Sequence, residues 1–288
     1  MNKTDSKGSP FWGKTPLVQE EDIFSEFGEK RGSTLFLGKY SLTEVMAVLG
    51  KKSFFNESRK RDLWPLRYDL DSSEFPLQRL RIYNRERKPE SVIVDLKIRT
   101  GFYWPKDRIV LGHCFSDYRC LILEWLTLQN PLLSFTPRRP ALPGQLSPGL
   151  GLGKKVVDVF VYLARLSHLD AILAFPAYFH NAVLFSRYFR FLNPAKEAEV
   201  LAIRKSLAKI PLKQLAWIVH LGCLKKAGSG VYEWNSEEQV HSLNKSLKDY
   251  FGSRAYKEAV RFGLKSMSFE VDWEAYERKM KASPEAKA

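Results

Sequence analysis

The spacing of apolar residues changes twice in the middle of the chain, and these changes predict a strand, a helix and a second strand. Residues 120–128 (CLILEWLTL) form a nearly continuous apolar run that is too short for a typical helix, which predicts a central strand. From residue 154 to residue 166 apolar residues recur every three or four positions, which predicts a helix with one apolar face. Residues 169–175 (LDAILAF) return to the composition of a buried strand, and Pro176 ends it. The three elements form a βαβ unit, whose crossover is expected to be right-handed.

The preceding part of the chain predicts a short strand, a helix and a hairpin. Residues 33–40 indicate the strand. Ser41 and Glu44 have the spacing of a capping box, in which each side chain accepts a hydrogen bond from the backbone of the other, so a helix is expected to follow. Residues 77–85 and 91–100 alternate with period two, which predicts an antiparallel hairpin.

After residue 193 the predicted elements are helices. Residues 197–209, 212–224 and 236–251 have helical patterns, and Pro211 separates the first two. The predicted organisation is a flexible N-terminal arm, an α+β core, a helical extension packed on that core and a disordered tail, at residues 1–30, 31–193, 194–280 and 281–288.

A glycine-rich loop lies between the central strand and the helix, with alternate glycines at Gly149, Gly151 and Gly153. The first amides of a helix have no partner within it, and glycines let a ligand approach the backbone without interference from a Cβ atom. The loop is therefore expected to hold an anionic group such as a phosphate. The alternative is that the glycines serve only to make a tight turn.

These segments, followed by the sequence HNAVLFSRYFRF from His180, resemble the core of the GNAT N-acetyltransferase superfamily. The resemblance implies an α+β fold with a GNAT-like mixed sheet flanked by helices, to which this chain adds a C-terminal helical extension. The chain departs from the family pattern at three places. Gln145 lies four residues before Gly149 rather than three, Phe185 stands where a tyrosine is expected, and Phe189 stands at or beside the expected glycine.

The resemblance also implies a co-substrate and a reaction. The co-substrate is acetyl-CoA or another acyl-CoA, and the reaction moves its acyl group to an amine acceptor. Loop amides would hold the pyrophosphate. The residues expected to contact the co-substrate are Leu126, Leu128, Gln145, Gly149, Gly151, Gly153 and Lys154.

Transfer of an acyl group to an amine needs a base for the amine and an acid for the departing thiolate. Glu124 interrupts the apolar run of the central strand, and burial there would strengthen it as a base. The alternative is that Glu124 lies on an exposed strand face or pairs with an arginine. Phe185 cannot donate a proton, so Tyr188 is the candidate acid, with Tyr178 as a substitute. His180 stands at a predicted helix start, where a cap or a surface group is the more frequent role.

The chain is strongly basic, with 46 Lys and Arg against 32 Asp and Glu and a net charge of +14. One CoA needs only a few positive charges, so nucleic acid or an anionic membrane surface also has to be considered. Residues 51–67 interleave basic residues with Phe54, Phe55 and Trp64, as in proteins that bind single-stranded nucleic acid. The alternative, which we favour, is a helix whose aromatic face is core, on a protein whose basic surface is merely solvated.

Several other classes of site are not indicated. Three cysteines without a CxxC pair argue against a disulfide framework and a zinc site, and the histidines have no metal-ligand spacing. No apolar run is long enough for a transmembrane helix, and the first residues lack the apolar core of a secretory signal. A cytoplasmic protein is the simplest expectation.

Three functions therefore stay open at this point. The first is a GNAT-like acyltransferase. The second is a GNAT-like binding module that has lost catalysis. This hypothesis is suggested by Phe185 and by the position of Gln145. The third is a basic protein associated with nucleic acid.

Overall fold

The structure is a computed structural model, and it describes residues 35–283. The predicted N-terminal arm, residues 1–30, lies outside the described residues, as do residues 284–288 of the predicted tail. The chain divides into two compact units that interleave along the sequence. Within the described residues the first unit contains the chain up to Thr100, Trp125–Pro131 and Leu150–Leu163, and the second unit contains the remainder.

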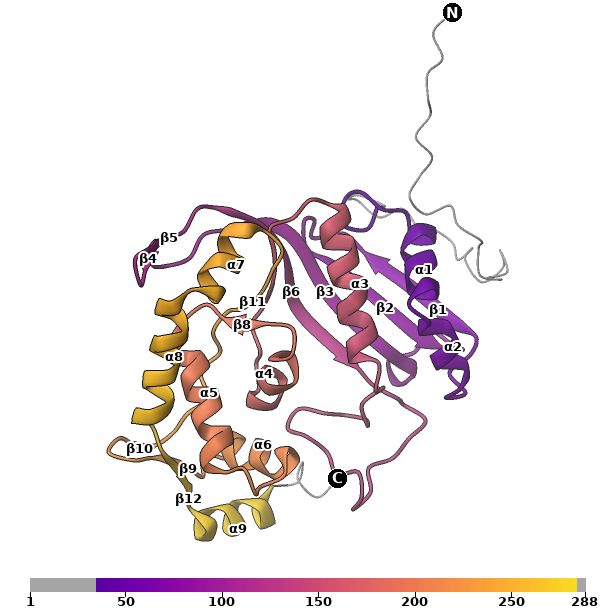
Figure 1. Cartoon of the computed structure of the whole chain (residues 1–288). Helices are drawn as coiled ribbons and strands as arrows, with labels where there is room; N and C mark the ends of the chain where they lie inside the picture. Colours follow the sequence, from indigo (N-terminus) through magenta and orange to yellow (C-terminus); the bar gives the residue numbers. More distant parts are fainter. Residues whose placement is uncertain (1–34, 284–288) are drawn as a thin grey trace, which may run out of the picture. The chain divides into compact units, whose positions relative to one another are not determined.

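Seven strands form a mixed sheet with the order β1-β2-β3-β6-β7-β11-β8 (Figure 1). Strands β6 and β7 pair in parallel, whereas β1–β2, β2–β3, β7–β11 and β11–β8 pair antiparallel. The bounds are β1 (Leu66–Asp71), β2 (Gln78–Asn84), β3 (Val92–Tyr103), β6 (Tyr118–Leu128), β7 (Ala171–Ala174), β8 (Arg190–Phe191) and β11 (Gln239–Ser242). The predicted α+β class with a mixed sheet flanked by helices is confirmed, as is the parallel pair around the predicted helix.

In the first unit, three helices cover the apolar face of β1–β3 (Figure 1). They are α1 (Leu42–Lys51), α2 (Phe54–Arg59) and the part of α3 (Gly153–Leu166) that belongs to this unit. The predicted capping box is present at the start of α1, because the Ser41 amide donates to Glu44 Oε2 at 2.8 Å and the Glu44 amide donates to Ser41 Oγ at 3.3 Å. A short 3-10 helix, η2 (Pro89–Ser91), connects β2 to β3.

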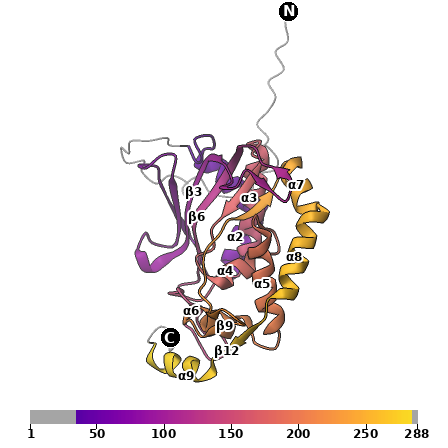
Figure 2. The same cartoon turned by 90° about the vertical axis from the view of Figure 1, so that its left-hand side faces the viewer.

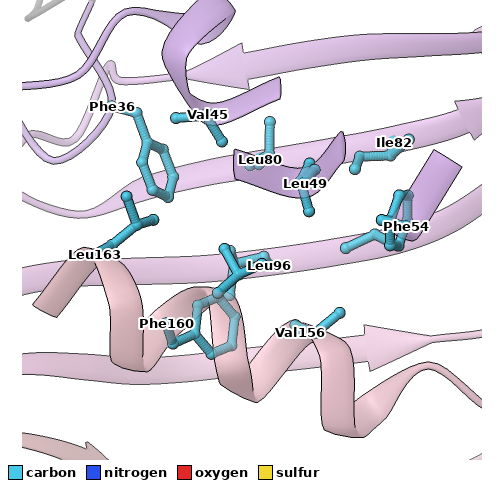
Figure 3. Close-up of a pocket in the computed structure, with 12 residues that line it drawn as sticks. Phe36, Val45, Leu49, Phe54, Leu80, Ile82, Leu96, Val156, Phe160 and Leu163 are labelled. Atoms are coloured by element: carbon cyan, nitrogen blue, oxygen red, sulfur yellow. The ribbon is translucent and has the colours of Figure 1, made fainter. Parts of the chain in front are cut away.

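A cavity of about 30 Å³ lies within this core (Figure 3). Its lining is entirely apolar and includes Leu49, Leu80, Leu96 and Phe160, which Figure 3 shows converging from α1, β2, β3 and α3. A space that small with no polar lining stays dry and has no group that could orient a substrate. It is therefore a packing gap between the helices and the sheet.

The opposite face of β2 and β3 carries alternating charges. Arg79 donates two parallel hydrogen bonds to the carboxylate of Asp95, at 2.7 and 2.6 Å. Nη1 of Arg81 donates to Oδ2 of Asp69 on β1 at 3.2 Å. Cross-strand pairs of opposite charge stabilise a sheet face that is exposed to water. This pairing explains β1, which the apolar pattern did not predict, because its outward residues are polar and find their partners on the neighbouring strands.

The second unit contains the remaining helices and two small sheets. Its helices are α4 (Phe179–Phe185), α5 (Pro194–Ser206), α6 (Leu212–His220), α7 (Lys245–Gly252), α8 (Arg254–Ser266) and α9 (Trp273–Ala282). One small sheet has the order β10-β9-β12, and the other is the hairpin β4–β5. The strand bounds are β4 (Ile109–Val110), β5 (His113–Cys114), β9 (Leu224–Lys226), β10 (Gly230–Val231) and β12 (Phe269–Val271).

Four details of the prediction are wrong. Residues 35–40 form a tight turn with a bridge between Phe36 and Tyr40 rather than a strand. The segment after residue 193 is not wholly helical, since it contains β9, β10, β11 and β12. The helix predicted at 236–251 begins only at Lys245, because Gln239 and Val240 are buried in the main sheet. The predicted tail is helical up to Ala282, where α9 ends.

Helix α8 packs closely on α5, and Figure 2 shows it on the outer side of that helix. A Cβ atom added at Gly263 would lie 2.7 Å from the Cβ of Ala198, closer than two side chains can approach. The hydroxyl of Tyr256 donates to the carbonyl of Phe191 at 2.7 Å, which fixes the rotation of α8. Gly263 is therefore the point of closest approach between the two helices.

We expect Gly263→Ala to lower the free energy of unfolding by about 1–3 kcal/mol, the usual cost of overpacking. This sign is opposite to helix propensity, which favours alanine over glycine by about 1 kcal/mol. Urea denaturation followed by circular dichroism measures the difference. Gly252→Ala is the matched control, because no atom lies within 4 Å of its added Cβ and the variant should be at least as stable as the parent. A Gly263→Ala protein as stable as the parent would contradict the close α5–α8 contact.

Candidate functional site

The glycine loop is anchored by its leucines and exposes its glycines. The amide of Leu150 donates to the carbonyl of Leu128, at the end of β6, at 3.1 Å. Leu150 and Leu152 are each only 2% exposed, whereas Gly149 and Gly151 between and beside them are exposed. The alternation therefore presents bare backbone to the solvent on a loop whose position is fixed by apolar burial.

Gly151 adopts a left-handed backbone conformation, with φ of +73°. Most residues with a side chain are strained there, so a tight turn is part of the reason for a glycine at this position. Helix α3 begins two residues later, and the amide of Val156 is bonded to the carbonyl of Leu152. The earlier amides of the first turn have no carbonyl within the helix, and they carry the positive end of its dipole.

Arg61 lies beside this loop, and the sequence did not identify it as a site residue. Its Nη2 atom lies 3.8 Å from the position that a Cβ on Gly151 would occupy. Its Nη1 atom donates to the carbonyl of Glu57 at 2.8 Å and to Glu57 Oε2 at 2.7 Å. The hydrogen bond from Arg61, together with one from Lys60, lowers the pKa of the Glu57 carboxyl. The guanidinium is therefore held in place by one edge while its other edge faces the loop.

The structure brings together only part of the predicted co-substrate site. Leu128 Cδ1 lies 4.0 Å from a Cβ position on Gly153, so the strand end and the helix start are adjacent. Lys154 is exposed on the first turn of α3, and Leu126 is half-buried on β6. These residues and Gly151 belong to the first unit, as does Arg61.

Gln145 has a local role in the structure. Its Oε1 atom accepts a hydrogen bond from the backbone amide of Leu142 at 3.0 Å. The backbone amide of Gln145 donates to the carbonyl of Leu142 at 3.1 Å. The side chain therefore closes a turn of the second unit, to which Gly149 also belongs. Contact of Gln145 with a co-substrate stays a prediction.

The candidate base, Glu124, is exposed rather than buried. It follows Leu123, the last residue of β6 that pairs with β7, and β6 continues to Leu128 beyond that pairing. The expectation that burial would strengthen this carboxylate as a base is therefore wrong, and the alternative of an exposed strand face is correct. A role of Glu124 as the base stays a prediction.

The candidate acid, Tyr188, follows helix α4 and is half-buried. Its hydroxyl is shielded from solvent and has no hydrogen-bond partner within the described residues. Its carbonyl lies 2.7 Å from Nδ1 of His241 on β11, which fixes the backbone at this point. Phe185 packs against Phe189 at a ring distance of 5.6 Å, so this departure from the family pattern serves the core.

His180 is a core histidine rather than a cap or a surface group. It is 4% exposed and stacks on the ring of Tyr178 at 5.4 Å. Burial lowers the pKa of His180 to about 4, and the neighbouring His220 contributes to the shift. Tyr178 also covers Gly144, where an added Cβ would lie 2.4 Å from the tyrosine hydroxyl. Both rings are therefore parts of a packed cluster.

The basic and aromatic segment at residues 51–67 does not offer rings to a nucleic acid. Phe54 and Phe55 are 1% and 4% exposed and belong to the core of the first unit. The guanidinium of Arg59 covers the ring of Trp64 at 3.9 Å. The interpretation of this segment as a base-stacking surface is wrong, and the alternative of an aromatic core face is correct.

The described residues contain no group of three His, Cys, Asp or Glu side chains that could hold a metal ion. No helix within the same part of the chain is long and apolar enough to cross a membrane. Comparisons with protein-family models, with curated proteins and with solved structures gave no match. The resemblance to the GNAT superfamily therefore stays a prediction, and function has to be argued from the loop and the residues around it.

The low pKa of His180 makes stability depend on pH. Between pH 6.5 and about 4 the unfolded chain binds a proton at this residue that the folded chain does not bind. The free energy of unfolding should therefore fall as the pH falls through this window, by up to about 1.4 kcal/mol per pH unit. In His180→Gln this contribution is absent, so thermal unfolding of the variant should depend less on pH between 6.5 and 4.

His220→Gln is the matched control, since His220 is exposed and contributes less than burial does to the lowered pKa of His180. That variant should keep most of the pH dependence of the parent protein. Equal slopes for the parent and His180→Gln would show that folding does not lower the pKa of His180.

Proposed function

We propose that the chain binds acetyl-CoA or a longer acyl-CoA at the loop formed by residues 149–153 and transfers the acyl group to an amine acceptor. One observation carries the first half of this proposal. The exposed, left-handed Gly151 leads into the free amides of α3 and lies beside the guanidinium of Arg61. A pyrophosphate has the charge and the acceptor oxygens that such a set of donors would hold.

The surroundings of the loop support a phosphate ligand in three ways. The amides of the first turn of α3 supply donors and the positive end of a helix of 14 residues. Arg61 can form paired hydrogen bonds with phosphate oxygens, and the exposed Lys154 adds a second cation. The buried Leu150 and Leu152 hold the loop open, so little ordering is needed when a ligand arrives.

The transfer step follows from the chemistry of a thioester. The amine nitrogen attacks the thioester carbonyl as its proton passes to a base, the carbon–sulfur bond breaks, and the thiolate takes a proton to leave as free CoA. Glu124 is our candidate base because it is exposed and lies on β6, the strand that ends at the loop. Tyr188 is the candidate acid, and its shielded hydroxyl would have to become accessible to the leaving thiolate.

A second candidate function is a binding module without catalysis. Its support is that Phe185, which packs against Phe189, has no hydroxyl to protonate the thiolate, and that the hydroxyl of Tyr188 is shielded from solvent. Both candidates use the same loop. They differ in whether bound acyl-CoA is consumed.

Gly151→Asp and Gly151→Asn test the loop as a matched pair. Both residues tolerate a left-handed backbone, so their folding costs should be similar. The aspartate would lie next to Arg61 and place a negative charge where the pyrophosphate has to approach. We expect Gly151→Asp to weaken CoA binding at least about tenfold more than Gly151→Asn, because like charges in contact cost more than about 1.4 kcal/mol. Isothermal titration calorimetry with acetyl-CoA and free CoA measures both.

Arg61→Gln and Arg59→Gln provide a second pair at the same site. Arg59 stacks on Trp64, so its removal should leave the affinity near that of the parent, whereas removal of Arg61 should weaken binding about tenfold or more. Tight CoA binding by both Gly151→Asp and Arg61→Gln, with folding retained, would rule out the loop as the pyrophosphate site.

Glu124→Gln tests the reaction. If Glu124 accepts the proton of the amine, this variant should release free CoA from acetyl-CoA about two orders of magnitude more slowly than the parent, with CoA affinity nearly unchanged. The release of thiol is measured with a panel of small amines, polyamines and peptide amines. Unchanged turnover would remove Glu124 from the mechanism, and a parent protein that binds acyl-CoA without releasing thiol to any amine would favour the binding module.

A further inference from the structure

Helices α7 and α8 carry a concentration of positive charge that the proposed acyl-CoA site does not use. The segment from Lys245 to Ser266 contains six basic residues and two acidic residues, all eight of them exposed. The basic residues are Lys245, Lys248, Arg254, Lys257, Arg261 and Lys265. The acidic residues are Asp249 and Glu258.

The packing of α8 directs three of these basic residues outward along one line. Gly263 faces α5, as its close approach to Ala198 shows. The buried Tyr256 on the same side of α8 bonds to Phe191 on β8. At 100° per residue, Arg254, Arg261 and Lys265 fall on the opposite side of the helix, within a narrow stripe. Arg261 and Lys265 are separated by about 6 Å along the axis, at 1.5 Å per residue.

Most of these cations are not used within the protein. Arg254 is bonded to Glu258 at 2.7 Å, and Lys257 donates to the carbonyl of Gly252 at 2.6 Å. Among the described residues, no ion pair involves the other four: Lys245, Lys248, Arg261 and Lys265. Their charge is therefore available to a partner.

The basic surface continues beyond α7. Arg165, exposed at the end of α3, and Lys248 on α7 both lower the pKa of His241, which burial has already lowered. Both cations therefore lie within electrostatic range of the same buried histidine. We call the surface formed by Arg165 and the six basic residues of α7 and α8 the basic face; all of it belongs to the second unit.

The chemistry of the basic face favours a polyanion over a bilayer. A helix that binds membranes inserts a continuous apolar face among the lipids. The apolar face of α8 is occupied by α5, and the large apolar side chain left among the cations is Phe262, which is 75% exposed. Phosphates spaced along a chain match cations spaced along a helix, and an exposed ring between them can stack on an unpaired base.

We propose that the basic face binds the phosphate backbone of single-stranded nucleic acid, with Phe262 stacking on a base. The net charge of +14 attracts such a polyanion at long range, and the stripe on α8 gives it a place to bind. This proposal is independent of the loop, since it uses none of the residues assigned to the acyl-CoA site. It also differs from the segment at residues 51–67, whose aromatic rings are buried or covered.

The test compares two triple variants that remove the same charge from different places. K248Q/R261Q/K265Q neutralises the basic face, and K205Q/K209Q/K213Q neutralises three exposed lysines elsewhere in the second unit. Binding of fluorescent single-stranded RNA and DNA of about 20 nucleotides is measured by anisotropy as the salt concentration rises. Each lost phosphate contact reduces the slope of log K against log salt by about 0.7 for a single strand.

We expect the parent and the control variant to have similar slopes, and the basic-face variant to have a slope smaller by about 2 and a clearly weaker affinity at low salt. Phe262→Ala should weaken binding by at least about fivefold while leaving the salt slope unchanged, because stacking releases no counterions. Circular dichroism confirms that each variant is folded, and the single variant Arg261→Gln replaces the triple variant if the latter is not.

Three results would overturn the proposal. The first is the absence of binding at low salt, where the electrostatic contribution is largest. The second is an equal loss in both triple variants, which would show a diffuse attraction to overall charge. The third is binding to vesicles of anionic lipid with no binding to either oligonucleotide.

Discussion

One constraint governs the connection between β6 and α3. The chain must cross from the end of the strand to the start of the helix while its buried backbone groups still find hydrogen-bond partners. The hydrogen bond from the Leu150 amide to the Leu128 carbonyl ties the glycine loop back to the end of the strand. Burial of Leu150 and Leu152 anchors the loop at these two residues. With alternate residues anchored, the intervening glycines have to face the solvent. The exposed backbone that we assign to phosphate binding is therefore a consequence of how the loop is packed.

Much of the fold could be predicted from apolar periodicity, and the errors have a common physical origin. Strand β7 and residues 120–123 of β6 are buried on both faces, and their apolar runs are visible in the sequence. Strand β1 has polar residues on its outward face, and these are explained only by Asp69 and Arg81 meeting across two strands. Strand β11 lies in a segment with helical character, and its position between β7 and β8 overrides that local preference. Pairing between distant segments is the information that a periodic pattern lacks.

The candidate site shows the same difference between local sequence patterns, which can be predicted, and contacts between distant segments, which cannot. The glycine loop was predictable because its residues are close in sequence and change the period of the chain. Arg61 was not predictable, because it and Gly151 are about 90 residues apart in the sequence. Its position also depends on the hydrogen bonds that hold it to Glu57. The exposure of Glu124 and the burial of Phe54 could only be given as alternatives, because neither the face of a strand nor the depth of a helix can be read from composition alone. Exposure is set by the neighbours that tertiary structure supplies.

The positions of the positive charges assign them to two different proposed ligands, acyl-CoA and nucleic acid. The sequence alone shows only their total. A cation acts on a ligand when it is positioned and not already neutralised by the protein. Arg61 meets the first condition through Glu57 at one edge of its guanidinium, and it keeps the other edge for the loop. The cations of α7 and α8 meet the second condition along a helix whose inner face is fixed by Tyr256. A small dianionic group suits the first arrangement and an extended polyanion suits the second, so the excess of 14 charges does not have to serve one ligand.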